Sequence, residues 1–176
     1  MAKPLTQIAH QLDPEALTCR AVIETPAGSR AKYKYNDKCR AIELARILPA
    51  SMSFPLDYGF VPGTLAEDGD AIDILVLSDI PLPAGCLATV RLVGVVIAEQ
   101  TEKDGRTVRN DRLIARSVES LSYASINSIE ELGEPFVKEL KRFFVAYNEF
   151  RGRKFEVQSV EGPEKAAALI ASASAG

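Results

Sequence analysis

Short β-type segments broken by proline and glycine fill the chain from Arg20 to Val118, and helical patterns follow only after them. In the segment Arg30–Asn36, basic side chains alternate with alanine and tyrosine, as a strand with two different faces requires. The segment 73–77, DILVL, is apolar after its first residue, which is typical of a buried strand. Strands followed by helices predict an α+β fold whose sheet is closed or strongly curved.

The same reasoning assigns the other segments. Strands are predicted at 20–26, 86–100, 112–118 and 154–162, whereas 41–48 fits a strand or a helix equally well. Gly94 predicts a bend or bulge in the longest strand. Helix starts are indicated by a capping box at 128–131, by Pro135 and by Pro163. The second of these helices carries one apolar stripe, formed by Phe136, Leu140, Phe143 and Tyr147.

The 176 residues suit a single domain, 1–176, with an N-terminal extension over about 1–18 and a frayed tail over about 172–176. A net charge of −3 gives no nucleic-acid-binding surface, and no apolar run reaches the length of a membrane span. With no secretory signal, we expect a cytoplasmic protein in which Cys19, Cys39 and Cys86 are reduced thiols. His10 is the single histidine, which excludes a Ser-His-Asp triad in the body of the chain and a histidine-rich metal site.

Carboxylates crowd at the start of the apolar segment, at Asp68, Asp70 and Asp73. An acidic turn in solvent is one interpretation, but the mutual repulsion of these groups is a cost that a bound cation would remove. The run is not an EF-hand, because Ile72 stands at a ligand position and Asp73 at the position of the loop glycine. Gly69 permits a turn that brings the three carboxylates together. Such an all-oxygen site favours a hard cation, magnesium or manganese.

Magnesium takes its remaining ligands from water and from substrate phosphates, so cationic side chains belong beside such a site. The candidates in or near the β-type segments are Lys32, Lys34, Arg46 and Arg112. Each alone is typical of a solvated strand face. Together with the acidic cluster, they predict a polyphosphate site.

Several runs stand in an order that is typical of one protein family. They are VIETP (22–26), KYKY (32–35), LARILPASMSFPLDYGFVPGTL (44–65), DGDAIDI (68–74), PLPAGCLATVRLVGVV (81–96) and FFVAYNEFRGRKFEV (143–157). With these runs the chain, from about Cys19 to Ile170, resembles the soluble family I inorganic pyrophosphatases. The family's diagnostic pattern is Asp-x-Asp-Pro-φ-Asp-φ, in which φ is apolar, and Ala71 here replaces the proline.

The resemblance implies a small five-stranded OB-like β-barrel with two or three packed helices, and hydrolysis of pyrophosphate to two phosphates with several magnesium ions. By the resemblance, metal is held by Asp68, Asp70, Asp73 and Glu24. The catalytic groups would be Asp70, which orients or deprotonates the attacking water, with Tyr58 and Arg46. Phosphoryl groups would be held by Lys32, Arg46, Tyr58, Arg112 and Tyr147. The resemblance also implies a homo-oligomer, a hexamer in bacterial members.

The chain departs from the family pattern within the expected active site. Lys34 replaces an acid, Phe54 a tyrosine, Asn148 a lysine, and Arg112 a lysine. Lys34 is either a plain surface lysine or a cation that stands in for metal charge. Two further aspartates are expected in 98–117, where Asn110 occupies one position and the other falls near Gln100. The acids that could substitute with a shifted loop are Glu99, Asp104 and Asp111.

Three hypotheses follow. The first is a magnesium pyrophosphatase with a modified metal set, which the retained Asp68, Asp70 and Asp73 favour. The second is a weak or inactive paralogue that binds pyrophosphate or a phosphorylated ligand as a regulator, for which the missing aspartates argue. The third is a structural barrel with an acidic rim and no ligand, which the number of retained active-site positions disfavours.

Overall fold

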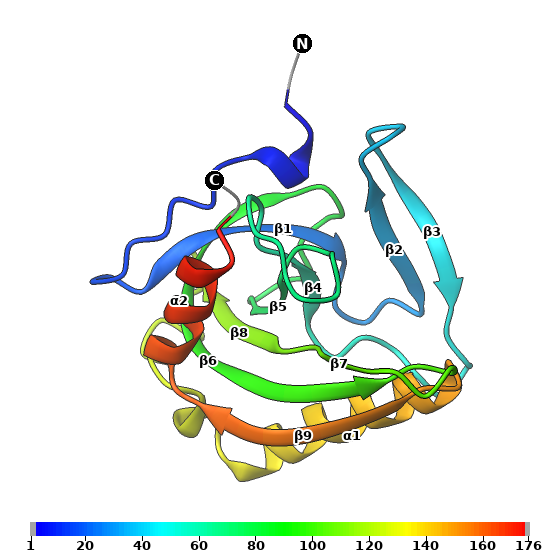
Figure 1. Ribbon diagram of the computed structural model, residues 1–176. Helices are drawn as coiled ribbons and strands as arrows, with labels where there is room; N and C mark the ends of the chain where they lie inside the picture. Colours follow the sequence, from blue (N-terminus) through cyan, green and yellow to red (C-terminus); the bar gives the residue numbers. More distant parts are fainter. Residues whose placement is uncertain (1–2, 175–176) are drawn as a thin grey trace.

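A closed ring of strands forms the centre of the molecule in the computed structural model, which describes residues 3–174 (Figure 1). In the order of their pairing, the strands are β1 (Thr18–Thr25), β4 (Asp57–Phe60), β5 (Asp73–Leu77), β8 (Arg112–Ser117) and β6 (Leu87–Thr101). The ring closes because β6 also pairs with β1. Only β5 and β8 are parallel among these neighbours. The pairing confirms the α+β fold with an OB-like ring of strands.

Other elements extend or cover this ring. Strands β7 (Thr107–Arg109) and β9 (Lys154–Glu161) pair with the long strand β6, and β2 (Ala31–Asn36) forms a separate hairpin with β3 (Ala41–Ile47). Helix α1 (Glu134–Phe150) packs under β9, whereas α2 (Pro163–Ser172) lies against β6 on another side (Figure 1). Two short 3-10 helices are η1 (Leu5–Gln7) and η2 (Ile129–Leu132).

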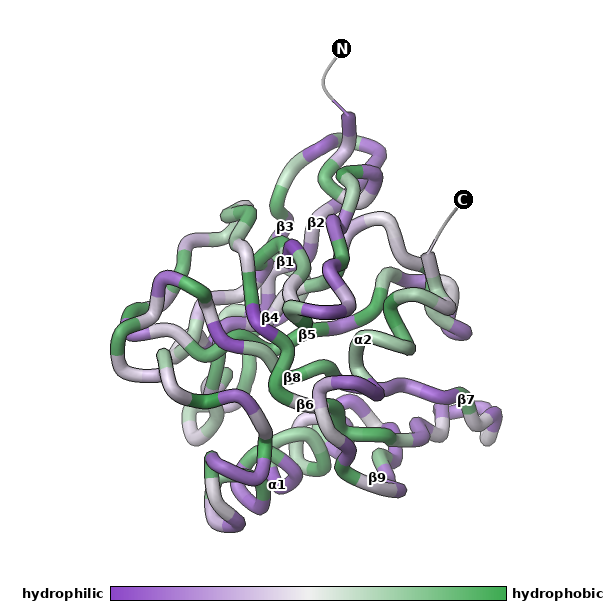
Figure 2. The backbone as a smooth tube through the Cα atoms, turned by 90° about the vertical axis from the view of Figure 1, so that its left-hand side faces the viewer, coloured by the Kyte–Doolittle hydropathy of each residue, from purple (hydrophilic) through white to green (hydrophobic). Residues whose placement is uncertain are grey.

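Two apolar clusters lie on opposite faces of the ring strands. Alternate residues of β5 divide between them: Ile74 and Val76 belong to the interior cluster, and Leu75 and Leu77 to the cluster that packs against α1. Because both faces of β5 are buried, its sequence is a continuous apolar run instead of an alternating one. Figure 2 shows the same hydrophobic concentration along β5, β8 and β6.

Most segments follow the sequence predictions. The ambiguous segment 41–48 is strand β3, and Gly94 marks a bulge in the pairing of β6 with β8. Pro135 lies in the first turn of α1, as predicted. Ser128 does cap a helix, accepting a hydrogen bond from the Glu130 N–H at 3.3 Å, but that helix is a single 3-10 turn. The four-residue strand β4 was not assigned from the sequence, because it is short and contains Gly59.

The remaining expectations concern the ends of the chain, the thiols and the membrane. Residues 175–176 of the tail that we expect to fray lie outside the described residues, whereas Ser174 forms a β-bridge with Thr64. All three cysteines are free. Within residues 3–174, no helix is long and apolar enough to cross a bilayer. The single-domain boundaries stay a prediction.

Gly59 on β4 is expected to be essential for closing the ring. A Cβ at this position would lie 1.9 Å from the Val22 carbonyl oxygen and 3.0 Å from the Ile23 Cα, and both atoms are backbone of β1. Gly59→Ala should lower the free energy of unfolding by about 3 kcal/mol, because the two strands must separate. Denaturant titration measures this loss. Gly162→Ala is the matched control, since its nearest contact is the flexible Glu164 carboxylate at 3.3 Å. Equal stability of both variants would contradict the expectation.

Candidate active site

A polar cavity of about 450 Å³ opens where the ring, the β2–β3 hairpin and the end of α1 meet. Its lining includes every site residue predicted from the sequence. These residues are Glu24, Lys32, Arg46, Tyr58, Asp68, Asp70, Asp73, Arg112 and Tyr147. They come from seven different segments of the chain, so the fold brings together what the sequence separates.

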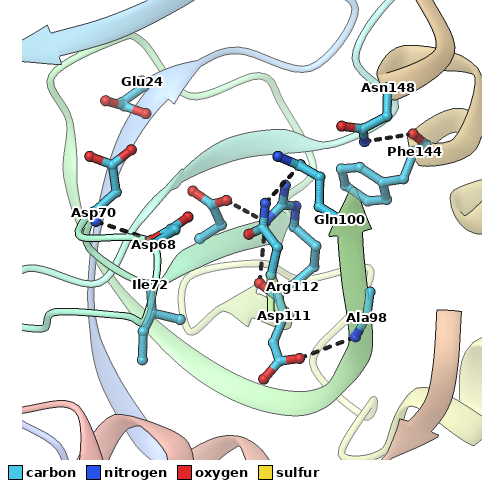
Figure 3. Close-up of polar contacts among 12 residues, drawn as sticks. Glu24, Asp68, Asp70, Ile72, Ala98, Gln100, Asp111, Arg112, Phe144 and Asn148 are labelled. Atoms are coloured by element: carbon cyan, nitrogen blue, oxygen red, sulfur yellow. Dashed lines mark hydrogen bonds and ion pairs between the residues drawn. The ribbon is translucent and has the colours of Figure 1, made fainter. Parts of the chain in front are cut away.

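The acidic turn lines part of this polar cavity. Gly69 has a φ of +85°, which allows the chain to reverse between Ala66 and Asp70, and the Asp70 N–H donates to the Asp68 carboxylate at 3.1 Å. The turn therefore brings Asp68, Asp70 and Asp73 to one cavity, as predicted. Glu24, Asp70 and Asp68 lie along one side of the site, and Arg112 and Gln100 lie opposite (Figure 3).

Burial and crowding act on the charges of these acids. Burial, together with the negative charges of Asp73 and Asp70, raises the pKa of Asp68. Oxygen donors that repel each other are the kind of set that a hard divalent cation satisfies. In residues 3–174, however, no three His, Cys, Asp or Glu side chains already surround one point. A cation would therefore have to draw the carboxylates together.

Arg112 fixes the position of Asp73. The two residues face each other across the parallel pairing of β5 and β8, and their side chains form an ion pair at 2.5 Å. Arg112 is only 4% exposed, and its guanidinium lies 5.3 Å from the ring centre of Phe144. A buried cation of this kind is stabilised by its partner carboxylate and by the aromatic surface around it.

Lys32 is a buried cation without a hydrogen-bond partner. Its ammonium lies 3.4 Å from the ring centre of Tyr58 and 4.0 Å from the nearest oxygen of Glu24, and no described group accepts a hydrogen bond from it. Burial lowers the pKa of Lys32 to about 8, against the opposing attraction of Glu24. An unpaired donor in such a place indicates that a ligand oxygen completes its hydrogen bonding.

Lys32 also faces a second cation directly. It is the cross-strand partner of Arg46 in the β2–β3 hairpin, and both side chains line the cavity. Like charges in this position destabilise a hairpin unless something neutralises them. Glu24 does so only partly, because its other oxygen accepts the Tyr35 N–H at 2.7 Å. The arrangement fits an anionic ligand held between the two strands.

Gln100 and Asn110, which stand where the resemblance implies aspartates, both line the cavity. They hydrogen-bond to each other, with Asn110 Nδ2 donating to Gln100 Oε1 at 2.9 Å. Arg112 donates to the amide oxygen of Asn110, and the Gln100 amide donates to Glu102 at 2.5 Å. These amides are thus occupied by a chain of hydrogen bonds that starts at Asp73 and Arg112.

The three acids that could substitute with a shifted loop do not line the polar cavity. Glu99 is exposed, and Asp104 borders a neighbouring cavity. Asp111 accepts hydrogen bonds from the Ala98 N–H at 3.1 Å and from Arg109 at 2.7 Å. Asp111 also lines a cavity that adjoins the polar one, together with Asp68 and Asp73.

The replaced residues Phe54 and Asn148 have structural roles. Phe54 is buried among the rings of Tyr58, Tyr147 and Phe143, with ring centres between 5.2 and 5.7 Å apart. Asn148 is fully buried, and its amide donates to the Phe144 carbonyl at 2.9 Å. Neither side chain lines the cavity, so these substitutions add no polar group to it.

Lys34, a candidate from the sequence, also lines the cavity, and so do three cations that the sequence analysis did not single out, Arg106, Arg151 and Arg153. Lys34 forms an ion pair with Asp70 at 3.0 Å, which favours the view that it supplies charge to the site. Arg151 lies over the Tyr147 ring at 5.5 Å, and its spacing of four residues from Tyr147 was the signal that could have found it. No comparable sequence signal marks Arg106 or Arg153.

Comparisons with known proteins agree with this geometry. A family model described as inorganic pyrophosphatase matches residues 21–175. The inorganic pyrophosphatase of Thermus thermophilus is 40% identical over 141 residues, covering 80% of this chain and 78% of that protein. That of Geobacillus stearothermophilus is 36% identical over 151 residues, covering 85% and 88%. The crystal structure of the T. thermophilus enzyme superposes with a TM-score of 0.86 at 32% identity, covering 98% of this chain and 97% of that one.

The low pKa of Lys32 predicts pH-dependent anion binding. The ammonium is charged below a pKa of about 8 and neutral above it, so anion affinity should fall as the pH rises through that value. Sulfate is a suitable probe, because it does not titrate in this range. NMR titration of metal-free protein from about pH 7 to about pH 9 should show the loss.

Lys32→Met tests whether this residue causes the effect. The variant should bind sulfate weakly at every pH. Its sulfate affinity should not change around the pKa of about 8 that Lys32 has in the unmodified protein. Lys38→Met, which changes an exposed lysine in the β2–β3 turn, should keep the pH dependence of the unmodified protein. A Lys32→Met variant that retained the full pH dependence would assign it to another group.

Proposed function

The chain belongs to the inorganic pyrophosphatase family, and we propose that it hydrolyses pyrophosphate to two phosphates with the help of magnesium. The reaction takes place in the polar cavity described above, which we call the catalytic cavity from here on. The single observation that carries this proposal is that one cavity gathers both kinds of charge. Its lining holds the carboxylates of Asp68, Asp70 and Asp73, and the buried or half-buried cations Lys32, Arg46 and Arg112. Hydrolysis of a phosphoanhydride needs both: a carboxylate that orients or deprotonates the attacking water, and fixed positive charge that binds the phosphoryl oxygens.

Members of this family are metal-dependent, and the acidic side of the cavity has the donors that such ions take. We assign metal binding to Asp68, Asp70, Asp73 and Glu24. The raised pKa of Asp68, caused by burial and by its anionic neighbours, is the feature that fits a divalent cation. When bound, magnesium would supply charge neutralisation and Lewis-acid activation of water.

In the proposed mechanism, Asp70 accepts the proton of the attacking water. Its side chain is 63% exposed, so solvent can carry the proton away. Lys32, Arg46 and Arg112 hold the two phosphoryl groups through charge-assisted hydrogen bonds. These cations also stabilise the charge that develops on the leaving phosphate.

The two tyrosines act as neutral donors in this proposal. Burial raises the pKa of Tyr58 well above its ordinary value, so its hydroxyl keeps its proton. A protonated phenol can donate to a phosphoryl oxygen without adding negative charge. Tyr147 is also buried, and its ring is packed against Phe143 with ring centres 5.8 Å apart. That packing fixes the direction in which its hydroxyl points.

Further parts of the proposal concern assembly and alternatives. We propose a homo-oligomer, a hexamer by analogy with bacterial members, in a cytoplasmic setting. Exposed apolar side chains that an interface could cover include Leu44, Ile47, Ile80 and Leu121. Each relative named above carries the name of an enzyme, so nothing favours the alternative of an inactive, ligand-binding regulator.

Asp70→Asn tests the catalytic assignment directly. The amide cannot accept the water proton, so phosphate release from pyrophosphate should fall by about 100-fold or more at saturating magnesium. Asp37→Asn, in the β2–β3 turn outside the cavity, should leave the rate unchanged. An unaltered rate in Asp70→Asn would exclude this residue as the base. No release by the unmodified, folded protein with magnesium or manganese would overturn the function itself.

Lys34→Gln tests whether a protein cation competes with metal. The Lys34 ammonium lies 3.0 Å from Asp70, and both side chains are more than half exposed, so the pair is weak and easily displaced. Removing the cation should tighten manganese binding to the metal-free protein by roughly threefold to fivefold, as calorimetry would measure. Lys154→Gln, which lies outside the cavity, is the control. Equal affinity in all three proteins would mean that Lys34 does not oppose metal.

A further inference from the structure

A second cavity, of about 400 Å³, adjoins the catalytic one, and we name it the annex. It lies at the corner where the β6–β7 turn, the end of α1 and the end of β3 come together (Figure 1). Its lining is charged throughout the described residues, and cations predominate. The cations are Arg46, Lys103, Arg106, Arg151 and Arg153.

Only two carboxylates oppose these cations, and both already have partners. Glu102 forms an ion pair with Arg153 at 2.7 Å and accepts a hydrogen bond from Gln100 at 2.5 Å. Asp104 accepts the backbone N–H of Arg106 at 3.0 Å. In the part of the chain that the structure describes, no carboxylate forms an ion pair with Lys103 or with the Arg106 guanidinium. The annex therefore holds an excess of positive charge.

The cations of the annex also repel one another. Burial, together with the charges of Arg46 and Arg153, lowers the pKa of Arg151. The Arg46 Nε is buried and has no hydrogen-bond partner among the described residues. Repelling cations with unused donors are a cost that a multivalent anion would remove.

The annex is continuous with the catalytic cavity. Arg46, Arg106, Arg151 and Arg153 line both of them, whereas Lys103 and Asp104 line only the annex. A linear anion could therefore lie with one end among the aspartates and the other beyond these arginines. Pyrophosphate is accounted for by the catalytic cavity, so the annex is available to a longer chain.

We propose that the annex binds the third phosphoryl group of inorganic triphosphate, which makes linear oligophosphates a second substrate class of this enzyme. This inference rests on the proposed function, because it uses the same acids and the same water. The described lining of the annex contains no aromatic side chain on which a base could stack, and Arg151 covers one face of Tyr147. Those features favour an inorganic oligophosphate over a nucleotide.

The reaction balances as a simple hydrolysis. The water oxygen bonds to the terminal phosphorus held near Asp70, and the bond from that phosphorus to the bridging oxygen breaks. One water proton passes to Asp70 and then to solvent. The leaving diphosphate keeps the bridging oxygen and its electron pair, and its far phosphoryl group lies in the annex. The products are phosphate and pyrophosphate, and pyrophosphate is then hydrolysed in turn.

The test compares triphosphate and pyrophosphate as substrates of the same protein. Lys103→Gln should raise the KM for triphosphate by roughly threefold to fivefold and leave the KM for pyrophosphate unchanged. Asp104→Asn keeps the oxygen that accepts the Arg106 N–H but removes a negative charge, so it should lower the KM for triphosphate. Lys154→Gln, next to Arg153 but outside both cavities, should change neither KM.

Hydrolysis rates, together with binding measurements, distinguish failure of this inference from failure of the proposed function. Hydrolysis of pyrophosphate without hydrolysis of triphosphate would overturn the annex and leave the function standing. An equal rise in the KM values of both substrates in Lys103→Gln would overturn it too, because it would show only that Lys103 attracts any anion electrostatically. ADP turned over as well as triphosphate would overturn the restriction to inorganic chains. If neither substrate is hydrolysed, calorimetry of metal-free protein decides: triphosphate that binds no more tightly than pyrophosphate overturns the annex.

Discussion

The ion pair between Asp73 and Arg112 is the interaction on which the rest of the site depends. It exists because β5 and β8 are parallel and in register, so that both strands begin at the same edge of the ring. The two strands are buried on both faces, and their starting point cannot shift without exposing the core. Removing either partner would leave an uncompensated charge beside that core, which is far more costly than the pair itself.

A chain of polar contacts runs from this pair across the cavity. Arg112 donates a hydrogen bond to Asn110, Asn110 donates to Gln100, and Gln100 donates to Glu102. Glu102 also forms an ion pair with Arg153. This line of contacts begins in the acidic side and ends in the annex. These contacts tie the β6–β7 hairpin to the ring. The turn itself is closed locally, by Gly105 at a φ of +84° and by the Glu102 N–H, which donates to the Arg106 carbonyl at 2.8 Å. The placement of the annex therefore depends on strand register as well as on this turn.

The sequence was most informative where a residue's type and its neighbours act together. The apolar run of β5 and the glycine before Asp70 predicted the strand and the turn, because both depend on local backbone properties. The sequence could not indicate that Arg106 and Arg153 would share a cavity, since that depends on long-range pairing of β6 with β7 and β9. Likewise, Asn148 stands where the family motif has a lysine, and the sequence could not show that the helix turns this side chain into the core.

The substitutions at the expected carboxylate positions follow one electrostatic trend, although Asn148, in place of a lysine, removes a positive charge elsewhere. Where the family resemblance implies carboxylates, the chain has Lys34 and the neutral amides of Gln100 and Asn110, and arginines stand beside them. Each change removes negative charge from the cavity or adds positive charge to it. Mobile divalent ions and fixed side-chain cations neutralise a phosphoanhydride in the same way, so a site richer in fixed cations needs fewer ions. Fixed side-chain cations also differ from divalent metal ions in position. They extend from the cavity walls, so they can contact the part of an anion that lies beyond the aspartates. Arg106, Arg151 and Arg153 are fixed cations of this kind, since they line both the catalytic cavity and the annex.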